Sequence, residues 1–282
     1  MDVRDLFIAI LLGLVEGMTE FAPISSTGHM IIIDDLLLQS HKVLGSHELA
    51  NTFKVVIQFG SIIAVVIIFW KRLRNLLRNA LTINNKDESS SQLTLTHIII
   101  GIIPATVLGL LFEGFIDRYL FRIETVIFGL LFGAILMLLA DHIAIEEYDQ
   151  KLSLDHISYK HALLIGLYQC LSLWPGFSRS GATISGGVLL GLQYRAASDF
   201  TFIMAIPIMF GASILSLYKK WHVMSLDVIP FFTVGFISAF IFAFFSIRFF
   251  LMLINQIKLK PFAMYRIVLA IILLIINLYF FV

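Results

Sequence analysis

Residues 13–30 read GLVEGMTEFAPISSTGHM, and this stretch decides how the chain folds. It begins as an apolar helix on which Glu16 and Glu20, four residues apart, share one face. Pro23 breaks that helix, because proline has no N–H group and disfavours the helical conformation of the residue before it. The hydroxyl residues after the break are N-cap candidates for a second helix, with His29 in its first turn. The free N–H groups of such a helix start form a ready site for an anion.

The composition places this stretch in a membrane. Of the 282 residues, 59% are hydrophobic and 14% are charged, and the mean hydropathy is +0.93. Globular proteins are roughly 45–50% apolar and about 25% charged. The sequence therefore predicts an all-α polytopic membrane protein, with residues 1–282 forming a single integral membrane domain. Six apolar runs approach the ~20 residues that span a bilayer, and they cover residues 52–70, 97–116, 124–141, 199–218, 228–250 and 265–282.

Other features of the composition narrow the function. The net charge of +1 gives no indication of nucleic-acid binding. The single cysteine, Cys170, cannot form an internal disulfide. The N-terminus has no small-residue cleavage site after its short apolar run, so we expect the first helix to remain in the mature protein.

A second interrupted segment, 166–191, reads GLYQCLSLWPGFSRSGATISGGVLLG, with its break at Pro175–Gly176. Residues 13–28 align with residues 166–181 without gaps, and Ser25 then falls on Ser178. Three apolar spans come after each break, which predicts an internal repeat of about 1–150 and 151–282. If each broken segment enters and leaves on one side, the odd number of spans inverts the second repeat. The predicted fold is six transmembrane helices plus two re-entrant broken-helix pairs in an inverted repeat.

The Lys and Arg residues orient this fold, because cytoplasmic loops carry the excess of them. We expect both termini outside, a connection exposed to solvent at 31–50, a polar loop at 78–92, and Asp141 at an interface near a span end. The outer side, which has fewer Lys and Arg residues, would carry Arg4, Lys42, Lys54, Arg118, Arg122, Lys219 and Lys220. The richer side would carry Lys71, Arg72, Arg74, Arg78, Lys86, Lys151, Lys160, Arg195, Lys258, Lys260 and Arg266.

Ionisable residues inside a membrane are by default candidates for a functional site. If the two breaks meet, Arg179 offers a fork of donors that suits phosphate oxygens, and helix starts add N–H groups. Glu16 and Glu20 would then need a hard cation between themselves and the anion, and Mg²⁺ or Ca²⁺ fits that position. The candidate site would contain Glu16, Glu20, Ser25, Ser26, Thr27, His29, Ser178, Arg179, Ser180 and Thr183.

The same residues indicate a reaction. His29 could act as a general acid or base, or activate a hydroxyl nucleophile, and Ser26 lies three residues before it. Each hydroxyl in the two breaks could equally be a simple helix cap. Together these groups indicate phosphoryl transfer from a lipid-borne phosphate.

The motifs EGMTEFAPISSTGH and PGFSRSGAT resemble those of the undecaprenyl-diphosphate phosphatases, the bacterial bacitracin-resistance proteins. The resemblance extends over essentially the whole chain and implies removal of the terminal phosphate from undecaprenyl diphosphate, in the plasma membrane of a bacterium. It also implies roles for individual residues. Glu16 and Glu20 would serve a divalent ion or proton transfer, Ser26 would be the nucleophile activated by His29, and the substrate-binding set would be Ser25, Thr27, Ser178, Arg179, Ser180 and Thr183.

Two other functions stay open at this point. Inverted repeats with broken helices are also a transporter architecture, so a secondary transporter or lipid-phosphate flippase is the alternative. A non-catalytic lipid-binding protein is a weaker one. The sequence leaves open which leaflet the site faces, whether Ser26 forms a phospho-enzyme or orients water, and whether the protein forms a homodimer.

Overall fold

The protein is described by a computed structural model over residues 1–81, 93–146, 152–220 and 226–280. The elements of the first half are α1 (Val3–Thr19), α2 (Ser26–Met30), the π-helix η1 (Ile31–Leu38), α3 (Ser40–Leu44), α4 (His47–Ile68), α5 (Trp70–Leu81), α6 (Leu95–Phe115), the π-helix η2 (Ile116–Leu120) and α7 (Ile123–Glu146). Those of the second half are η3 (Leu154–His156), α8 (Tyr159–Cys170), η4 (Leu171–Leu173), α9 (Arg179–Leu189), α10 (Tyr194–Lys220), η6 (Leu226–Val228), α11 (Ile229–Ile257) and α12 (Lys260–Phe280).

Six of these segments are long and apolar enough to cross a membrane, so the prediction of an all-α protein with six spans is confirmed. Their helical form follows from the medium, because a helix satisfies its own backbone hydrogen bonds where there is no water. The spans are His47–Ile68, Leu95–Leu120, Ile123–Ala144, Tyr194–Lys220, Leu226–Ile257 and Lys260–Tyr279.

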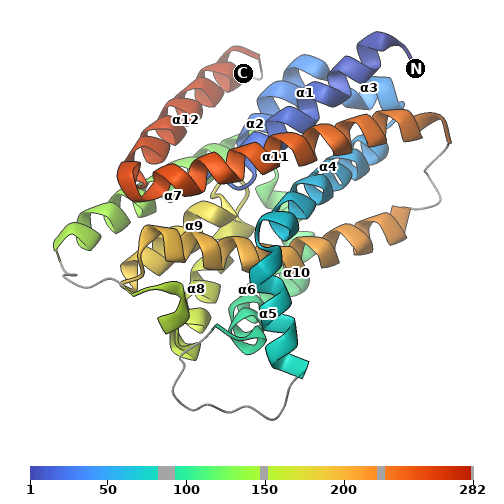
Figure 1. Ribbon diagram of the computed structural model, residues 1–282. Helices are drawn as coiled ribbons and strands as arrows, with labels where there is room; N and C mark the ends of the chain where they lie inside the picture. Colours follow the sequence, from blue (N-terminus) through green and yellow to red (C-terminus); the bar gives the residue numbers. More distant parts are fainter. Residues whose placement is uncertain (82–92, 147–151, 221–225, 281–282) are drawn as a thin grey trace.

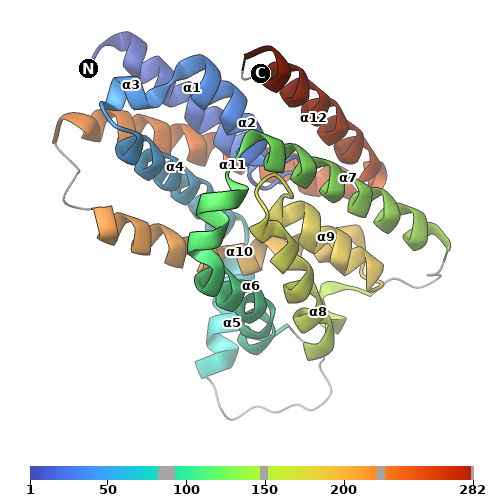
Figure 2. The same cartoon turned by 180° about the vertical axis from the view of Figure 1, so that it is seen from behind.

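The two halves of the chain are packed into one another. Helix α11 lies along both α1 and α4, α12 lies along α7, and α6 packs against α8 (Figure 1). Both termini lie at the same edge of the molecule, as the view from behind also shows (Figure 2). Since α1 and α11 come from opposite ends of the sequence, this packing fixes the first broken segment against the second half.

Small residues let α1 and α11 approach closely. An added Cβ at Gly13 would lie 2.3 Å from the Gly235 carbonyl oxygen, and one at Gly17 would lie 2.5 Å from the Ala239 carbonyl oxygen. Close backbone contact of this kind is a main source of helix association in membranes, where apolar burial gives little driving force. The position of Glu16, between these glycines, is set by the same contact.

The prediction that residues 31–50 form a connection exposed to solvent was wrong in part. Residues Ile31–Leu38 form a π-helix, and Asp34 is only 2% exposed. Its carboxylate accepts hydrogen bonds from the backbone N–H and the hydroxyl of Ser40, and it forms an ion pair of 2.9 Å with Lys54. A buried carboxylate needs such partners, and they hold this segment down against α4.

Arg266 also lies elsewhere than expected, whereas Asp141 lies near its expected position. Helix α12 begins at Lys260, so Arg266 lies six residues, or about 9 Å, inside the helix and is fully buried. Asp141 is buried too, and it accepts hydrogen bonds from the N–H groups of Leu259 and Lys260 and from the Tyr194 hydroxyl. It therefore caps the start of α12, and it lies three residues from the end of the span Ile123–Ala144, near a span end as expected. Of the expected polar loop, residues 78–81 belong to α5; residues 82–92, with Lys86, and also Lys151 lie outside the described ranges.

The two breaks have the same local geometry. Ser25 has φ 71° and ψ 97°, and Ser178 has φ 70° and ψ 119°, in the left-handed region that is strained for residues other than glycine. Each side chain accepts a hydrogen bond from the N–H group three residues later, at Gly28 and Gly181. This match supports the internal repeat, whose inverted and re-entrant character stays a prediction.

Candidate active site

The two breaks meet in the middle of the molecule, where the loop after α1 faces the loop before α9 in both views (Figures 1 and 2). The Ser180 hydroxyl donates a 3.1 Å hydrogen bond to the Ala22 carbonyl oxygen and so joins the two loops directly. Ser180 is fully buried, which makes this bond part of the interior rather than of an open surface. The central geometric expectation from the sequence, that the breaks lie together, is therefore met.

Glu20 is the residue to which both breaks connect. Its Oε2 accepts a 2.7 Å hydrogen bond from the Ser26 hydroxyl, and its Oε1 lies 3.3 Å from Nη2 of Arg179. The side chains of Arg179 and Glu20 are 13% and 8% exposed, so solvent screens this ion pair little. A carboxylate, a hydroxyl and a guanidinium are thus held within one hydrogen-bonded group.

Arg179 keeps one donor free for a ligand. Its Nη1 is buried and has no hydrogen-bond partner in the described chain, while its guanidinium lies 5.5 Å from the centre of the Phe21 ring. The guanidinium lines a cavity of about 290 Å³ together with Glu20, Ser26 and Ser178. Arg179 therefore borders this cavity and also has a buried donor without a partner, and an anionic group that enters beside it could satisfy that donor.

The other hydroxyls of the second break differ in their access to this cavity. Ser178 lines it, caps α9 and lies 3.2 Å from the Ser180 hydroxyl. Thr183 is fully buried, donates to the Arg179 carbonyl oxygen at 2.8 Å and accepts a hydrogen bond from Thr201. Ser180 and Thr183 therefore support the start of α9 and do not line the cavity, whereas Ser25 and Thr27 of the first break do.

The imidazole ring of His29 makes two hydrogen bonds within the described residues, and neither is to Ser26. Its Nδ1 lies 2.7 Å from the Ser25 carbonyl oxygen, and its Nε2 lies 2.7 Å from the Tyr265 hydroxyl. Because a carbonyl can only accept, Nδ1 carries a proton and Nε2 is the acceptor for Tyr265 in the neutral ring. The rings of His29 and Tyr265 are also stacked, with centroids 5.5 Å apart. The base in contact with Ser26 is Glu20.

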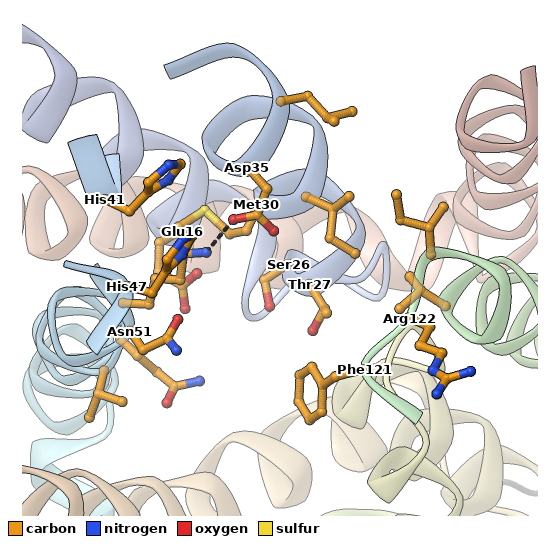
Figure 3. Close-up of a pocket in the computed structure, with 17 residues that line it drawn as sticks. Glu16, Ser26, Thr27, Met30, Asp35, His41, His47, Asn51, Phe121 and Arg122 are labelled. Atoms are coloured by element: carbon orange, nitrogen blue, oxygen red, sulfur yellow. Dashed lines mark hydrogen bonds and ion pairs between the residues drawn. The ribbon is translucent and has the colours of Figure 1, made fainter. Parts of the chain in front are cut away.

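Glu16 lies against Glu20 on the next turn of the same helix and is 4% exposed. It lines a second cavity of about 550 Å³, which also reaches Ser26 and Thr27. Figure 3 shows these two hydroxyl residues in the centre of that cavity, with Glu16 on one side and Arg122 on the other. Ser26 therefore borders both cavities.

The carboxylates of Glu16 and Glu20 are suited to a divalent cation whose remaining ligands come from water and phosphate. Two buried acids in contact repel one another unless a proton or a cation lies with them. The described residues contain no group of three or more His, Cys, Asp or Glu side chains that could hold a metal ion, so Glu16 and Glu20 are the charged ligands that this site offers. Mg²⁺ is usually held by one or two carboxylates, with waters and substrate phosphates completing the shell. The donor set is thus suited to a cation that arrives with a phosphate group.

Some residues of the site were missed from the sequence. Tyr265 contacts His29 from α12, and Gln58 of α4 lines both cavities. Two signals in the sequence could have found them. Tyr265 and Arg266 form a polar pair inside an apolar run, and Gln58 follows Asn51 and Lys54 at helical spacing in α4.

Comparison with known proteins identifies the family of this chain. The family of the bacitracin resistance protein BacA matches residues 9–272. The undecaprenyl-diphosphatase of Bacillus subtilis (strain 168) is 59% identical over 276 residues, covering 98% of this chain and 99% of the relative. The undecaprenyl-diphosphatase of Exiguobacterium sibiricum is 59% identical over 277 residues, with the same coverage. The match includes both breaks, and the chain belongs to the bacitracin resistance protein BacA family.

Proposed function

We propose that this protein is an integral membrane phosphatase that hydrolyses undecaprenyl diphosphate to undecaprenyl phosphate and inorganic phosphate. The observation that carries this proposal is one cavity lined by Ser26, Glu20 and Arg179, in which Glu20 accepts a hydrogen bond from Ser26 and pairs with Arg179. The relatives named undecaprenyl-diphosphatase support the choice of substrate. The reaction recycles the lipid carrier for cell-wall synthesis, which takes place at the bacterial plasma membrane.

The headgroup binds at the second break in this proposal. The guanidinium of Arg179 contacts oxygens of the terminal phosphate through Nη1, and the N–H groups at the start of α9 lie beside Ser178. These donors are fixed before the substrate arrives, because Ser178 and Ser180 hold the loop. Donors preorganised in this way stabilise the charge that spreads over the phosphoryl oxygens in the transition state.

Ser26 and Glu20 carry out the first chemical step. The Ser26 oxygen forms a bond to the terminal phosphorus, and the bond from that phosphorus to the bridging oxygen breaks, which releases undecaprenyl phosphate. The Ser26 proton passes to Glu20, 2.7 Å away. In the second step a water oxygen forms a bond to the phosphorus of the phosphoserine, and the bond from that phosphorus to the Ser26 oxygen breaks. Glu20 returns its proton to Ser26, and the hydrogens of the water leave with the inorganic phosphate. His29 is not among the residues that line the two cavities, and in this proposal its bonds to Ser25 and Tyr265 position the first turn of α2, which carries Ser26.

A divalent cation, Mg²⁺ or Ca²⁺, belongs to the proposal as a ligand of Glu16 and Glu20. When bound, it would neutralise charge on the diphosphate and polarise the leaving phosphate. We expect chelation by EDTA to abolish phosphate release and added Mg²⁺ or Ca²⁺ to restore it. Glu16→Gln should raise the cation concentration needed for half-maximal rate, since it removes one of the two carboxylates.

Phosphate release by the purified protein in detergent tests the proposed function directly. With a prenyl diphosphate as substrate, the wild type should release one phosphate per molecule, and Ser26→Ala should reduce the rate by at least a hundredfold. Ser246→Ala is the matched control, because that hydroxyl donates to the Met18 carbonyl oxygen and lines neither of the two cavities. Normal turnover in Ser26→Ala would contradict the role of Ser26.

The same preparation separates hydrolysis from transport. Movement of a lipid phosphate across reconstituted vesicles without phosphate release would support the transporter alternative. The homodimer also belongs among the proposals, and light scattering of the detergent-solubilised protein at two concentrations would decide between one and two copies.

A further inference from the structure

Arg266 is a buried cation that the chemistry above does not use. Its guanidinium is fully buried, and Nη2 donates hydrogen bonds to the carbonyl oxygens of Gly129 at 3.1 Å and Gly176 at 2.9 Å. Nη1 contacts the sulfur of Met137 at 3.6 Å, and Nε has no partner in the described chain. In the described ranges no carboxylate forms an ion pair with it. A charge held only by neutral groups inside a membrane is costly and calls for a reason.

Glycines leave room for this guanidinium. An added Cβ at Gly133 would lie 2.1 Å from Nη2 of Arg266, and one at Gly181 would lie 2.8 Å from Nη1. Gly176, whose carbonyl binds Arg266, has φ 91°, a conformation that glycine adopts at little cost. The guanidinium thus occupies a space that any larger side chain at Gly133 would close.

The position of Arg266 relative to the candidate site is specific. Gly176 lies two residues before Ser178, and Gly181 lies three residues after it. Arg266 therefore lies next to the chain on both sides of the strained Ser178, and it is not among the residues that line the cavity beside Arg179. A strained backbone conformation persists only where its surroundings hold it, and here Arg266 supplies the hydrogen bond to the loop.

We propose that Arg266 is a positioning residue for the diphosphate headgroup. It fixes the Gly176 carbonyl, and through it the turn that carries Ser178 and Arg179, and its charge adds a positive potential behind the start of α9. The bound diphosphate is then the anion that offsets this otherwise unpaired charge. The substrate named in this inference rests on the proposed function, whereas the measurement of pyrophosphate binding that tests it does not.

Two variants separate positioning from simple packing. Arg266→Met removes the charge and the donors, and we expect kcat/KM for prenyl diphosphate to fall by about 10–100-fold, since small misplacements of catalytic groups have effects of this size. Arg266→Lys keeps the charge but loses the fork of donors, and we expect it to recover only about a third of that loss on a logarithmic scale. Arg248→Gln is the matched control, because Arg248 is exposed on α11 and its guanidinium lies over the Phe244 ring, 4.4 Å from its centre.

A binding measurement keeps the test independent of catalysis. Inorganic pyrophosphate should raise the melting temperature of the wild-type protein in detergent, and Arg266→Met should need at least tenfold more pyrophosphate for the same rise. The inference is overturned if Arg266→Met folds and retains both wild-type kcat/KM within threefold and wild-type pyrophosphate dependence. It is also overturned if the variant only melts earlier, with unchanged kcat/KM per folded molecule.

Two further outcomes are distinguishable. If Arg266→Met does not accumulate, Arg266→Lys decides: a tenfold loss of kcat/KM at an unchanged melting temperature supports positioning, and an unchanged kcat/KM overturns it. If the wild type binds pyrophosphate but releases no phosphate from any prenyl diphosphate, the proposed function fails, while the pyrophosphate dependence of the variants still tests Arg266.

Discussion

Replacing Glu20 by glutamine tests which group takes the proton from Ser26. The substitution keeps the size of the side chain and exchanges one acceptor oxygen for an NH₂ group. In the native protein one oxygen accepts from Ser26 at 2.7 Å, and the other pairs with Arg179 at 3.3 Å. The variant loses the negative charge that pairs with Arg179 and that can take up the Ser26 proton, so it changes the chemistry while it leaves the shape of the cavity nearly intact.

The size of the effect follows from these two contacts. A positioned general base contributes about 10²–10⁴ to a rate, and at about 1.36 kcal/mol for each factor of ten this corresponds to roughly 3–5 kcal/mol of activation free energy. Breaking a buried ion pair on one side destabilises a protein by about 3–5 kcal/mol, and the 13% and 8% exposure of the two side chains leaves little screening to reduce that cost. A bound diphosphate should return part of the lost stability, because it gives Arg179 a new anion.

Phosphate release and thermal unfolding in detergent measure both effects. We expect turnover of Glu20→Gln to fall by at least a hundredfold and its melting temperature to recover in part when pyrophosphate is added. Glu48→Gln, on the exposed first turn of α4, is the control for the loss of one carboxylate. Turnover of Glu20→Gln within tenfold of the wild type would refute the assignment of the base. His29→Gln should then show the larger loss.

Three further results are expected. Arg179→Lys should raise KM for prenyl diphosphate by at least tenfold in phosphate-release assays, because the point charge of an ammonium group replaces the guanidinium donors. A KM unchanged from the wild type would contradict direct contact of Arg179 with the headgroup. Tyr265→Phe removes the hydrogen bond to Nε2 of His29 and should lower kcat by about 3–30-fold with KM nearly unchanged, and equal kcat in both proteins would show that the bond has no part in turnover. Gly13→Ala places a methyl group 2.3 Å from the Gly235 carbonyl oxygen and should destabilise the protein by about 1–3 kcal/mol in denaturant titrations, while an unchanged midpoint would mean that α1 and α11 can separate at no cost.

The broken segments could be predicted from sequence because their signals are local. Pro23 and Pro175 end helices by removing an N–H group, and Ser25 and Ser178 cap the next helix in each case, so the aligned patterns identified both breaks. The meeting of Glu20 with the second break was a geometric hypothesis from counting spans, and the ion pair across 159 positions agrees with it.

Other features depend on packing that leaves no local pattern. The apolar run that starts at residue 265 predicts a membrane-surface position for Arg266, whereas the helix begins at Lys260 under the cap of Asp141. The spacing of Ser26 and His29 predicts that they pair, but the ring of His29 turns toward Tyr265, 236 positions away. Side-chain direction depends on neighbours from distant helices, and a single sequence does not contain that information.

The ion pair between Arg179 and Glu20 also gives the assembly of this protein a time order. At about 5–20 residues per second of synthesis, roughly 8–32 s separate the two positions on the ribosome. During that interval Glu16 and Glu20 have already been synthesised, but Arg179 has not. Water or protons must therefore stabilise the two carboxyl groups while only the first half of the chain exists. We therefore expect the early helices to settle in the bilayer only when α9 arrives, and α12, made last, to complete the site as Tyr265 reaches His29.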